Sequence, residues 1–271
     1  MFKTVSISLI AILLLFFLRC TGDGKTPDVQ LPSEDTLTTE IVAIDSVSFK
    51  GLKFYYPPVA SIGLIVGDEP DTSNFYISFC CAAAYTDRSI YWHKGPAEHI
   101  HVAGDHIDGG ELHKGYPDDT FNTGGFVVYP YPFPEDCHWK IVNRQEFAQR
   151  VSSEIKPCAA FQQELLILDR EIQSCNRFSD DKPKRYRALC NYNGKLCIVD
   201  GTHDHLISSF VDLLYNAGIE DALYLDMGNW DYSWYRHYPD DLDSGLDYAK
   251  IINPRPQRYF GSNWLVFHLI N

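Results

Sequence analysis

Apolar and polar residues alternate in short runs along much of the chain after residue 41, and this pattern predicts β-strands. Side chains of a strand point to opposite faces in turn, so a strand with one buried face shows a period of two. Glycine and proline separate the runs and favour turns between them. The runs that predict strands are residues 41–54, 61–66, 75–84, 99–102, 104–112, 125–128, 164–168, 222–225 and 264–270.

A first segment has the spacing of an amphipathic helix instead. Asn143, followed three residues later by Glu146, has the form of a capping box at a helix start. Every fourth position after it is apolar on one face, and Pro157 ends the predicted helix. The apolar positions are Phe147, Val151 and Ile155.

A second helix is predicted after residue 202. Thr202 or Asp204 is the expected N-cap, and Gly218 is the expected C-terminal stop. The apolar face has the spacing i, i+3, i+4, i+7, which one side of an α-helix requires. Its residues are Ile207, Phe210, Val211 and Leu214.

A β-hairpin is predicted between these helices. Asn193-Gly194 is typical of a two-residue hairpin turn. Directly opposed cysteines in such a hairpin are near enough for a disulfide, and two small buried thiols are an equal alternative. The pairs expected from this turn are Tyr192 with Lys195, Asn191 with Leu196, and Cys190 with Cys197.

Many short strands and few helices, in no β-α-β order, predict an α+β fold. We expect a twisted, largely antiparallel or mixed sheet with two or three packed helices. No repeat of fixed period is present. The expected organisation is a targeting segment at residues 1–20, a polar tether at 21–45 and a single domain at 46–271.

The first twenty residues have the form of an export signal. Lys3 precedes an apolar run over residues 7–18, which is shorter than the roughly 20 residues of a spanning helix. Cys20 follows directly, where a bacterial lipoprotein carries its lipid, although Arg19 stands where that pattern prefers a small residue. We expect a lipid-anchored protein of the cell envelope, outside the cytoplasm; a plain secretory signal or an uncleaved anchor is the alternative.

Charge narrows the range of partners. With 23 basic and 36 acidic residues the formal net charge is −13. Nucleic acids and anionic membrane surfaces attract basic faces, so we expect neither as the main partner, and the membrane is reached through lipid at Cys20. Aromatic residues make up 14% of the chain, and most are expected in the core, with a minority available to stack on sugars.

The segment 185–228 carries a resemblance to a known family. Arg187 enters the hairpin, Asp200-Gly201 ends it, and after the second helix a buried strand leads to Asp226 and Gly228. This order resembles the phosphodiester glycosidase family, and weaker similarity at 79–87 and 104–128 extends it over most of the chain after residue 45. The resemblance implies removal of a sugar, N-acetylglucosamine in the best-known case, from a phosphodiester.

The chain departs from the family pattern in two places. Where the family has an Asn-Gly-Gly-Phe turn, this chain has three alanines at 82–84 and then Tyr85, without a polar side chain. The family's small, flexible loop after the aspartate becomes residues 227–236, which are rich in rings and hydrogen-bonding groups. The pattern indicates a pocket that is altered and not erased.

Few parts are needed to cleave a sugar–phosphate bond, since phosphate is a good leaving group. A guanidinium can hold the phosphate, which we assign to Arg187 and, second, Arg236. A carboxylate can steady the sugar centre, attack it or activate water; we assign Asp226, with Asp231 as second carboxylate. We expect Arg187, Asp226 and Arg236 to line one cleft. The further candidates for substrate binding are Gly228, Asn229, Trp230, Tyr232, Trp234 and, from the resemblance, Gln162 and Asp200.

Histidines offer a different interpretation. His99 with His101, and His203 with His205, are pairs spaced by two, so each pair shares a face if it lies on a strand and could help to bind a divalent metal. The sequence itself requires no cofactor, and it contains no Walker loop, GxSxG elbow, HExxH motif or Rossmann fingerprint.

The sequence thus predicts a hydrolase of a glycosyl phosphodiester or a related glycan bond at the cell envelope. The alternative is a glycan-binding envelope lipoprotein without catalysis, which the three alanines at 82–84 favour.

Overall fold

The computed structural model describes residues 45–57, 59, 61–86, 102–116, 122–130, 138–174, 182–226, 233–237, 248–253 and 263–269. All of them belong to one compact unit, Ile41–Asn271. The expected targeting segment and almost all of the tether lie outside the described residues. Within the described ranges, no helix has both the length and the hydropathy needed to span a membrane.

The first sheet has seven strands in the order β1-β2-β13-β12-β14-β10-β11, and neighbouring strands run antiparallel. Segments far apart in the chain lie next to each other in it, because β2 pairs with β13 and β12 pairs with β14. The strands are β1 (Asp45–Phe49), β2 (Leu52–Tyr56), β10 (Leu165–Leu168), β11 (Glu171–Ile172), β12 (Arg187–Tyr192), β13 (Lys195–Gly201) and β14 (Asp221–Leu225).

The second sheet has five strands in the order β16-β15-β4-β17-β3, again antiparallel. All six residues of β4 are buried, because it has neighbours on both edges and packs on both faces. The strands are β3 (Ser61–Val66), β4 (Ile77–Ala82), β15 (Ser233–His237), β16 (Tyr248–Asn253) and β17 (Asn263–His268).

The third sheet has five strands in the order β6-β5-β9-β7-β8 and is antiparallel as well. Gly125 on β7 lies where a Cβ atom would be 2.3 Å from a ring carbon of Phe147, so only glycine allows the helix to pack this closely. The strands are β5 (His106–Asp108), β6 (Glu111–His113), β7 (Gly124–Val128), β8 (Trp139–Asn143) and β9 (Ala159–Gln163).

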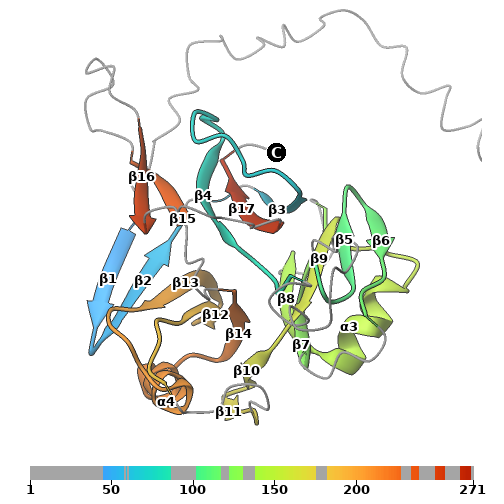
Figure 1. Cartoon of the computed structure of the whole chain (residues 1–271). Coiled ribbons are helices and arrows are strands. Elements are labelled where there is room, and N and C mark those ends of the chain that lie inside the picture. Colours follow the sequence, from blue (N-terminus) through green and yellow to red (C-terminus); the bar gives the residue numbers. More distant parts are fainter. Residues whose placement is uncertain are drawn as a thin grey trace, which may run out of the picture. The chain divides into compact units, whose positions relative to one another are not determined.

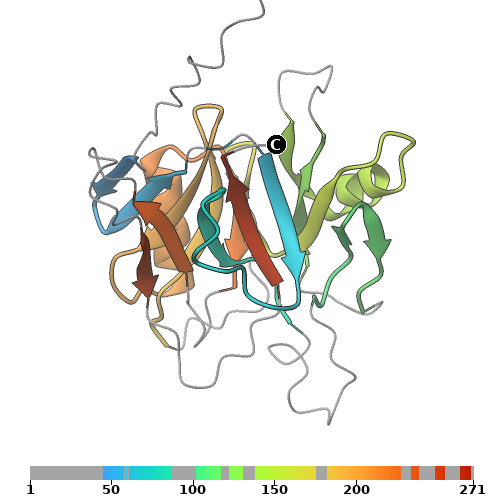
Figure 2. The same cartoon turned by 90° about the horizontal axis from the view of Figure 1, so that it is seen from above.

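The three sheets share one apolar core. Figure 1 shows them around a common interior, and Figure 2 gives the same arrangement from above. Leu223 of the first sheet, Phe79 of the second and Phe161 of the third are each at most 1% exposed and belong to the same buried cluster. Burial of this cluster is the main force that holds the sheets together. The predicted α+β class, with largely antiparallel sheets of many short strands, is confirmed.

Helix α4 (Ile207–Ala217) covers the other face of the seven-stranded sheet (Figure 1). The predicted apolar face is buried, and Gly218 ends the helix with a φ of 91°. The predicted N-caps are wrong. The cap residue is Leu206, which makes no side-chain capping bond. The helix starts late because His205 exchanges two backbone hydrogen bonds with Lys184 and is therefore held in an extended conformation.

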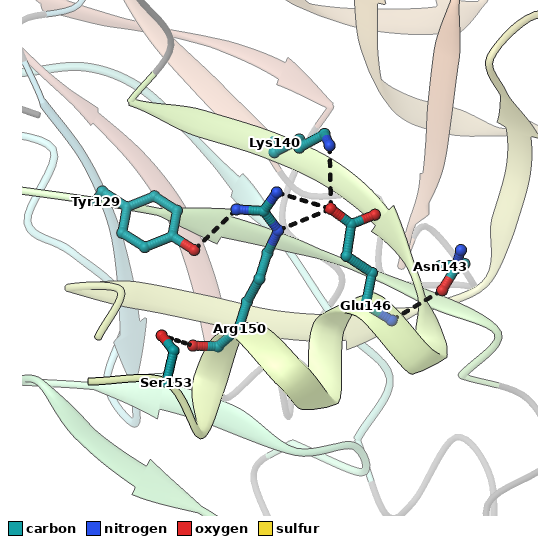
Figure 3. Close-up of polar contacts among 6 residues, drawn as sticks. All are labelled: Tyr129, Lys140, Asn143, Glu146, Arg150 and Ser153. Atoms are coloured by element: carbon teal, nitrogen blue, oxygen red, sulfur yellow. Dashed lines mark hydrogen bonds and ion pairs between the residues drawn. The ribbon is translucent and has the colours of Figure 1, made fainter. Parts of the chain in front are cut away.

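Helix α3 (Arg144–Val151) begins as predicted, with the Asn143 side chain accepting a hydrogen bond from the Glu146 amide at 2.9 Å. Figure 3 shows this cap and the ion pairs above it, in which one oxygen of Glu146 accepts from both Arg150 and Lys140. The helix ends before the predicted Pro157, and Ile155 is 59% exposed.

The predicted hairpin of β12 and β13 is confirmed pair by pair. Asn193 and Gly194 both have positive φ angles, 52° and 72°, which the two-residue turn requires. Cys190 lies directly opposite Cys197, and both are buried free thiols. Of the two alternatives for this pair, the structure shows the unbridged one.

Candidate functional site

The three sheets meet at the segment that follows β4. The Asp226 amide at the end of β14 donates a hydrogen bond to the Ala83 carbonyl at 3.0 Å, and the Gln163 side chain at the end of β9 donates to the same oxygen at 3.5 Å. The Ala83 amide donates to the Asn263 carbonyl at the start of β17, at 3.4 Å. We call Ala83, Ala84, Gln163, Asp226 and Asn263 the three-sheet junction.

Asn263 fixes this junction through its side chain. Its Oδ1 accepts a hydrogen bond from the Ala84 amide at 2.7 Å, and its Nδ2 donates to the Ala84 carbonyl at 3.0 Å. The side-chain amide thus pairs with both polar groups of one buried peptide residue. The alanines are at most 7% exposed, so their small size suits the close packing of chains here. Asn263 was not among the residues predicted from the sequence.

Asp226 is where the sequence predicts a functional acid, at the end of a buried strand, and is 8% exposed. Leu225 packs in the central core and Tyr224 in the cluster on the α4 side. Alternation of side chains, continued one residue past β14, places Asp226 on the same side as Tyr224. A second buried acid, Glu164, lies on this side and is 1% exposed. Its Oε2 accepts a hydrogen bond from the Tyr85 hydroxyl at 3.4 Å.

Glu164 was missed by the sequence analysis, although a signal is present. Residues 162–164 are three polar side chains in a row between the apolar runs of β9 and β10, and all three are at most 8% exposed. Buried polar side chains need partners, so an uninterrupted polar triplet inside apolar strands indicates a site.

Gln162 has a structural role in the described part of the chain. Its side-chain Oε1 accepts a hydrogen bond from the Asp105 backbone amide at 2.8 Å, and its backbone amide donates to the Asp105 carbonyl at 3.1 Å. A Cβ atom on Gly104 would lie 2.7 Å from the Gln162 Cβ, so the backbone passes very close here. Gln162 therefore holds the loop before β5 against β9.

Arg187 and Asp200 form a buried ion pair. Nε and Nη2 of Arg187 donate to the two carboxylate oxygens of Asp200 at 2.6 and 2.8 Å, and Arg187 is fully buried. Burial alone would lower the pKa of Arg187, but the Asp200 carboxylate outweighs it and the pKa is raised. The same charges reach the Cys81 thiol, whose pKa is raised to about 12, mainly by burial. Nη1 of Arg187 has no hydrogen-bond partner among the described residues.

The two arginines that the sequence assigns to phosphate are both buried and hydrogen-bonded. Arg187 is paired across the sheet with Leu225, and paired residues share a face, so Arg187 lies on the side opposite to Asp226. Arg236 is 1% exposed and donates to the carbonyls of Thr72 at 2.6 Å and Asn74 at 2.8 Å. Arg236 therefore fixes the loop before β4, and the Nε and Nη2 atoms that would bind a phosphate donate to backbone carbonyls instead.

Trp234, which the sequence offers as a sugar platform, is fully buried in an apolar cluster of the second sheet. The other residues proposed from the aromatic loop lie outside the described residues. They are Gly228, Asn229, Trp230, Asp231 and Tyr232.

Within the described ranges, no group of three or more histidine, cysteine, aspartate or glutamate side chains is placed to hold a metal ion. His203 and His205 do lie together, with ring centroids 4.1 Å apart. His99 and His101 fall outside the described residues.

No family model matches the chain, and no curated protein matches it. Among solved structures, it is similar to the catalytic domain of zebrafish N-acetylglucosamine-1-phosphodiester alpha-N-acetylglucosaminidase, auto-inhibited by its pro-peptide. That match has a TM-score of 0.51 and 14% identity over 83% of this chain and 81% of the other. A hypothetical protein from Synechocystis matches with a TM-score of 0.41 and 12% identity, and the present chain spans 61% of it. The chain thus shares a fold with the catalytic domain of a glycosidase.

Proposed function

We propose that this protein hydrolyses a glycosyl phosphodiester or a related glycan bond at the cell envelope. The observation that carries the proposal is the position of Asp226. This acid ends a buried strand at the point where three sheets meet, on a fold shared with a glycosidase catalytic domain. Strand ends in a rigid scaffold are where catalytic side chains are commonly placed.

In the proposed reaction the Asp226 carboxylate stabilises the positive charge that develops at the sugar C1. The leaving phosphate needs little help from an acid. Arg187 acts indirectly: bound to Asp200, it fixes the ends of β12 and β13 beside the strand that carries Asp226. We therefore propose Arg187 as a positioning residue, in place of the phosphate-binding role first expected.

The proposed location at the envelope rests on residues 1–20 alone. Lipid attached to Cys20 would hold the domain at a membrane surface through the tether. Substitution Cys20→Ser is expected to move the protein from the detergent phase to the aqueous phase in a Triton X-114 partition of whole cells. Equal partitioning of both forms would rule out the lipid anchor.

A non-catalytic glycan-binding lipoprotein is the second candidate. It is favoured by the buried alanines at 82–84, which bring no polar side chain to the junction. Calorimetry separates the two: binding of a sugar phosphate without turnover over days supports the binder, and turnover of the same compound rules it out.

The test of the hydrolase is release of sugar from a panel of benzyl phosphodiesters of sugar 1-phosphates. We expect turnover of at least one compound and a loss of about 100-fold or more in kcat for Asp226→Asn. Glu171→Gln is the control, because it removes an exposed acid from β11. Equal kcat in wild type and Asp226→Asn would contradict the assignment, and no turnover of any glycosyl phosphodiester would contradict the function.

A further inference from the structure

Glu164 is a buried acid that directly follows Gln163 of the three-sheet junction and lies between β9 and β10. We propose that Glu164 is the second carboxylate of the site, the base that takes a proton from the attacking water. The inference rests on the proposed hydrolase function and adds to it a catalytic residue and a stereochemical outcome.

The strand register places Glu164 beside Asp226. Leu165 is paired with Leu223, and the Tyr224 amide donates to the Glu164 carbonyl at 2.9 Å, so Glu164 lies opposite Tyr224. Asp226 follows Tyr224 by two residues. Alternation therefore places both acids on the α4 side of the sheet, as diagonal neighbours whose backbone positions are typically about 7–8 Å apart in an antiparallel pair.

Tyr85 holds Glu164 in place. Its hydroxyl donates to Glu164 Oε2 at 3.4 Å, and its ring packs on Tyr224 with a centroid distance of 5.5 Å. The Tyr85 carbonyl accepts from the Ala103 amide at 2.7 Å, which fixes its backbone. A hydrogen bond from a phenol stabilises the ionised carboxylate, the form that a base needs. Tyr85 is thus a positioning residue for Glu164.

The proposed step balances without a further reactant. The water oxygen forms a bond to C1 while the bond between C1 and the phosphate oxygen breaks. The electron pair of the broken bond leaves with the phosphate monoester. Glu164 takes the proton from the water and later releases it to solvent. Asp226 remains ionised and stabilises the charge at C1.

Whether an acid attacks C1 or activates a water molecule decides the stereochemistry. Enzymes that invert the sugar keep their carboxyl groups about 6.5–9.5 Å apart, because a water molecule must fit between base and sugar. Those that retain the configuration keep them about 5–5.5 Å apart, because one acid attacks C1 itself. In the proposed step water displaces the phosphate directly and neither acid attacks C1, so we expect inversion.

The test compares Glu164→Gln, Tyr85→Phe and the control Glu171→Gln in the intact protein, using the benzyl phosphodiester that the wild type turns over. We expect Glu164→Gln to lower kcat about 100-fold or more with little change in KM. Tyr85→Phe should lower kcat by about tenfold, since it removes one hydrogen bond to a charged group. Thermal unfolding shows whether each variant is folded.

Proton NMR of the sugar in the first minutes of reaction gives the stereochemistry. Inversion supports the proposal, and retention overturns it. Wild-type kcat in Glu164→Gln would overturn it as well, while a loss in Asp226→Asn alone would leave the proposed function standing. If Glu164→Gln does not fold, the same comparison is made with Glu164→Asp, which shortens the side chain; an unchanged kcat there overturns the proposal. Absence of turnover in the wild type overturns both.

Discussion

Arg187 donates hydrogen bonds from two nitrogens to the Asp200 carboxylate, at 2.6 and 2.8 Å. The two residues lie on adjacent strands, and Arg187 is fully buried. The charges of the pair act on the Cys81 thiol and the Tyr55 hydroxyl, and the pKa of that hydroxyl is raised, first by burial and then by Asp200. A charge in such a place is tolerated only while its partner is present.

Removing one partner of this pair is expected to destabilise the fold severely. Arg187→Met should lower the free energy of unfolding by about 3–5 kcal/mol, because Asp200 is left buried and unpaired. The double variant Arg187→Met/Asp200→Leu should recover most of the loss. Urea unfolding followed by fluorescence measures both. A single variant as stable as the wild type would show that the pair is solvated.

Asn263 is expected to be essential to the three-sheet junction. Asn263→Asp keeps the shape but replaces the donor to the Ala84 carbonyl with a second acceptor. We expect a loss of about 2–4 kcal/mol, since a buried carbonyl loses its donor and faces a like partial charge. Thermal unfolding tests this, with Asn216→Asp on the exposed side of α4 as control. Equal melting temperatures for the two variants would contradict the role of Asn263.

Arg236 is expected to control the order of the loop before β4. It donates to the carbonyls of Thr72, Asn74 and Ile77, and its guanidinium lies 5.2 Å from the ring centre of Phe75. Arg236→Ala should speed hydrogen exchange of amides 73–77 at least tenfold and leave the hairpin of β12 and β13 unchanged. Uniform acceleration across both segments would point to global destabilisation instead.

Buried thiols predict a loss of stability at alkaline pH. Burial raises the pKa of Cys81 and of Cys197 to about 12, against 9.0 for a free thiol. Well below pH 9 the two thiols are protonated in both the folded and the unfolded protein, so their contribution to stability is fully present. Above pH 9 the thiols of the unfolded chain ionise while the buried ones do not, so the free energy of unfolding falls until about pH 12. Urea unfolding from pH 7.5 to 10.5 measures this. Cys197→Ala should flatten the decline, and an identical slope in that variant would contradict the prediction.

The hairpin shows what local sequence can decide. Asn193-Gly194 accepts positive φ angles at both positions, so the turn and every pair of the ladder followed from the dipeptide alone. The start of α4 shows the limit. Thr202 and Asp204 are good caps by composition, but His205 is paired with Lys184, a residue outside the segment, and the helix must begin after it. Local preference gave way to a non-local hydrogen bond.

The candidate site divides in the same way. Asp226 could be predicted because a polar residue directly after a buried apolar strand is visible in one short stretch of chain. Glu164 and Asn263 could not be assigned to the site in advance, since their relation to Asp226 arises only from the pairing of β10 with β14 and from the contact of β17 with the segment after β4. Conversely, Arg187 and Arg236 have the residue type of phosphate ligands, and their carboxylate and carbonyl partners come from distant positions.

The sequence by itself determined the α+β class, several of the strands, the two helices, the hairpin register and the likeness to a glycosidase fold, because periodicity and turn chemistry act over a few neighbouring residues. Only the tertiary structure decided which distant residues each polar side chain contacts. The role of a charged side chain depends on the residues packed against it, and those residues come from strands that pair across the whole chain.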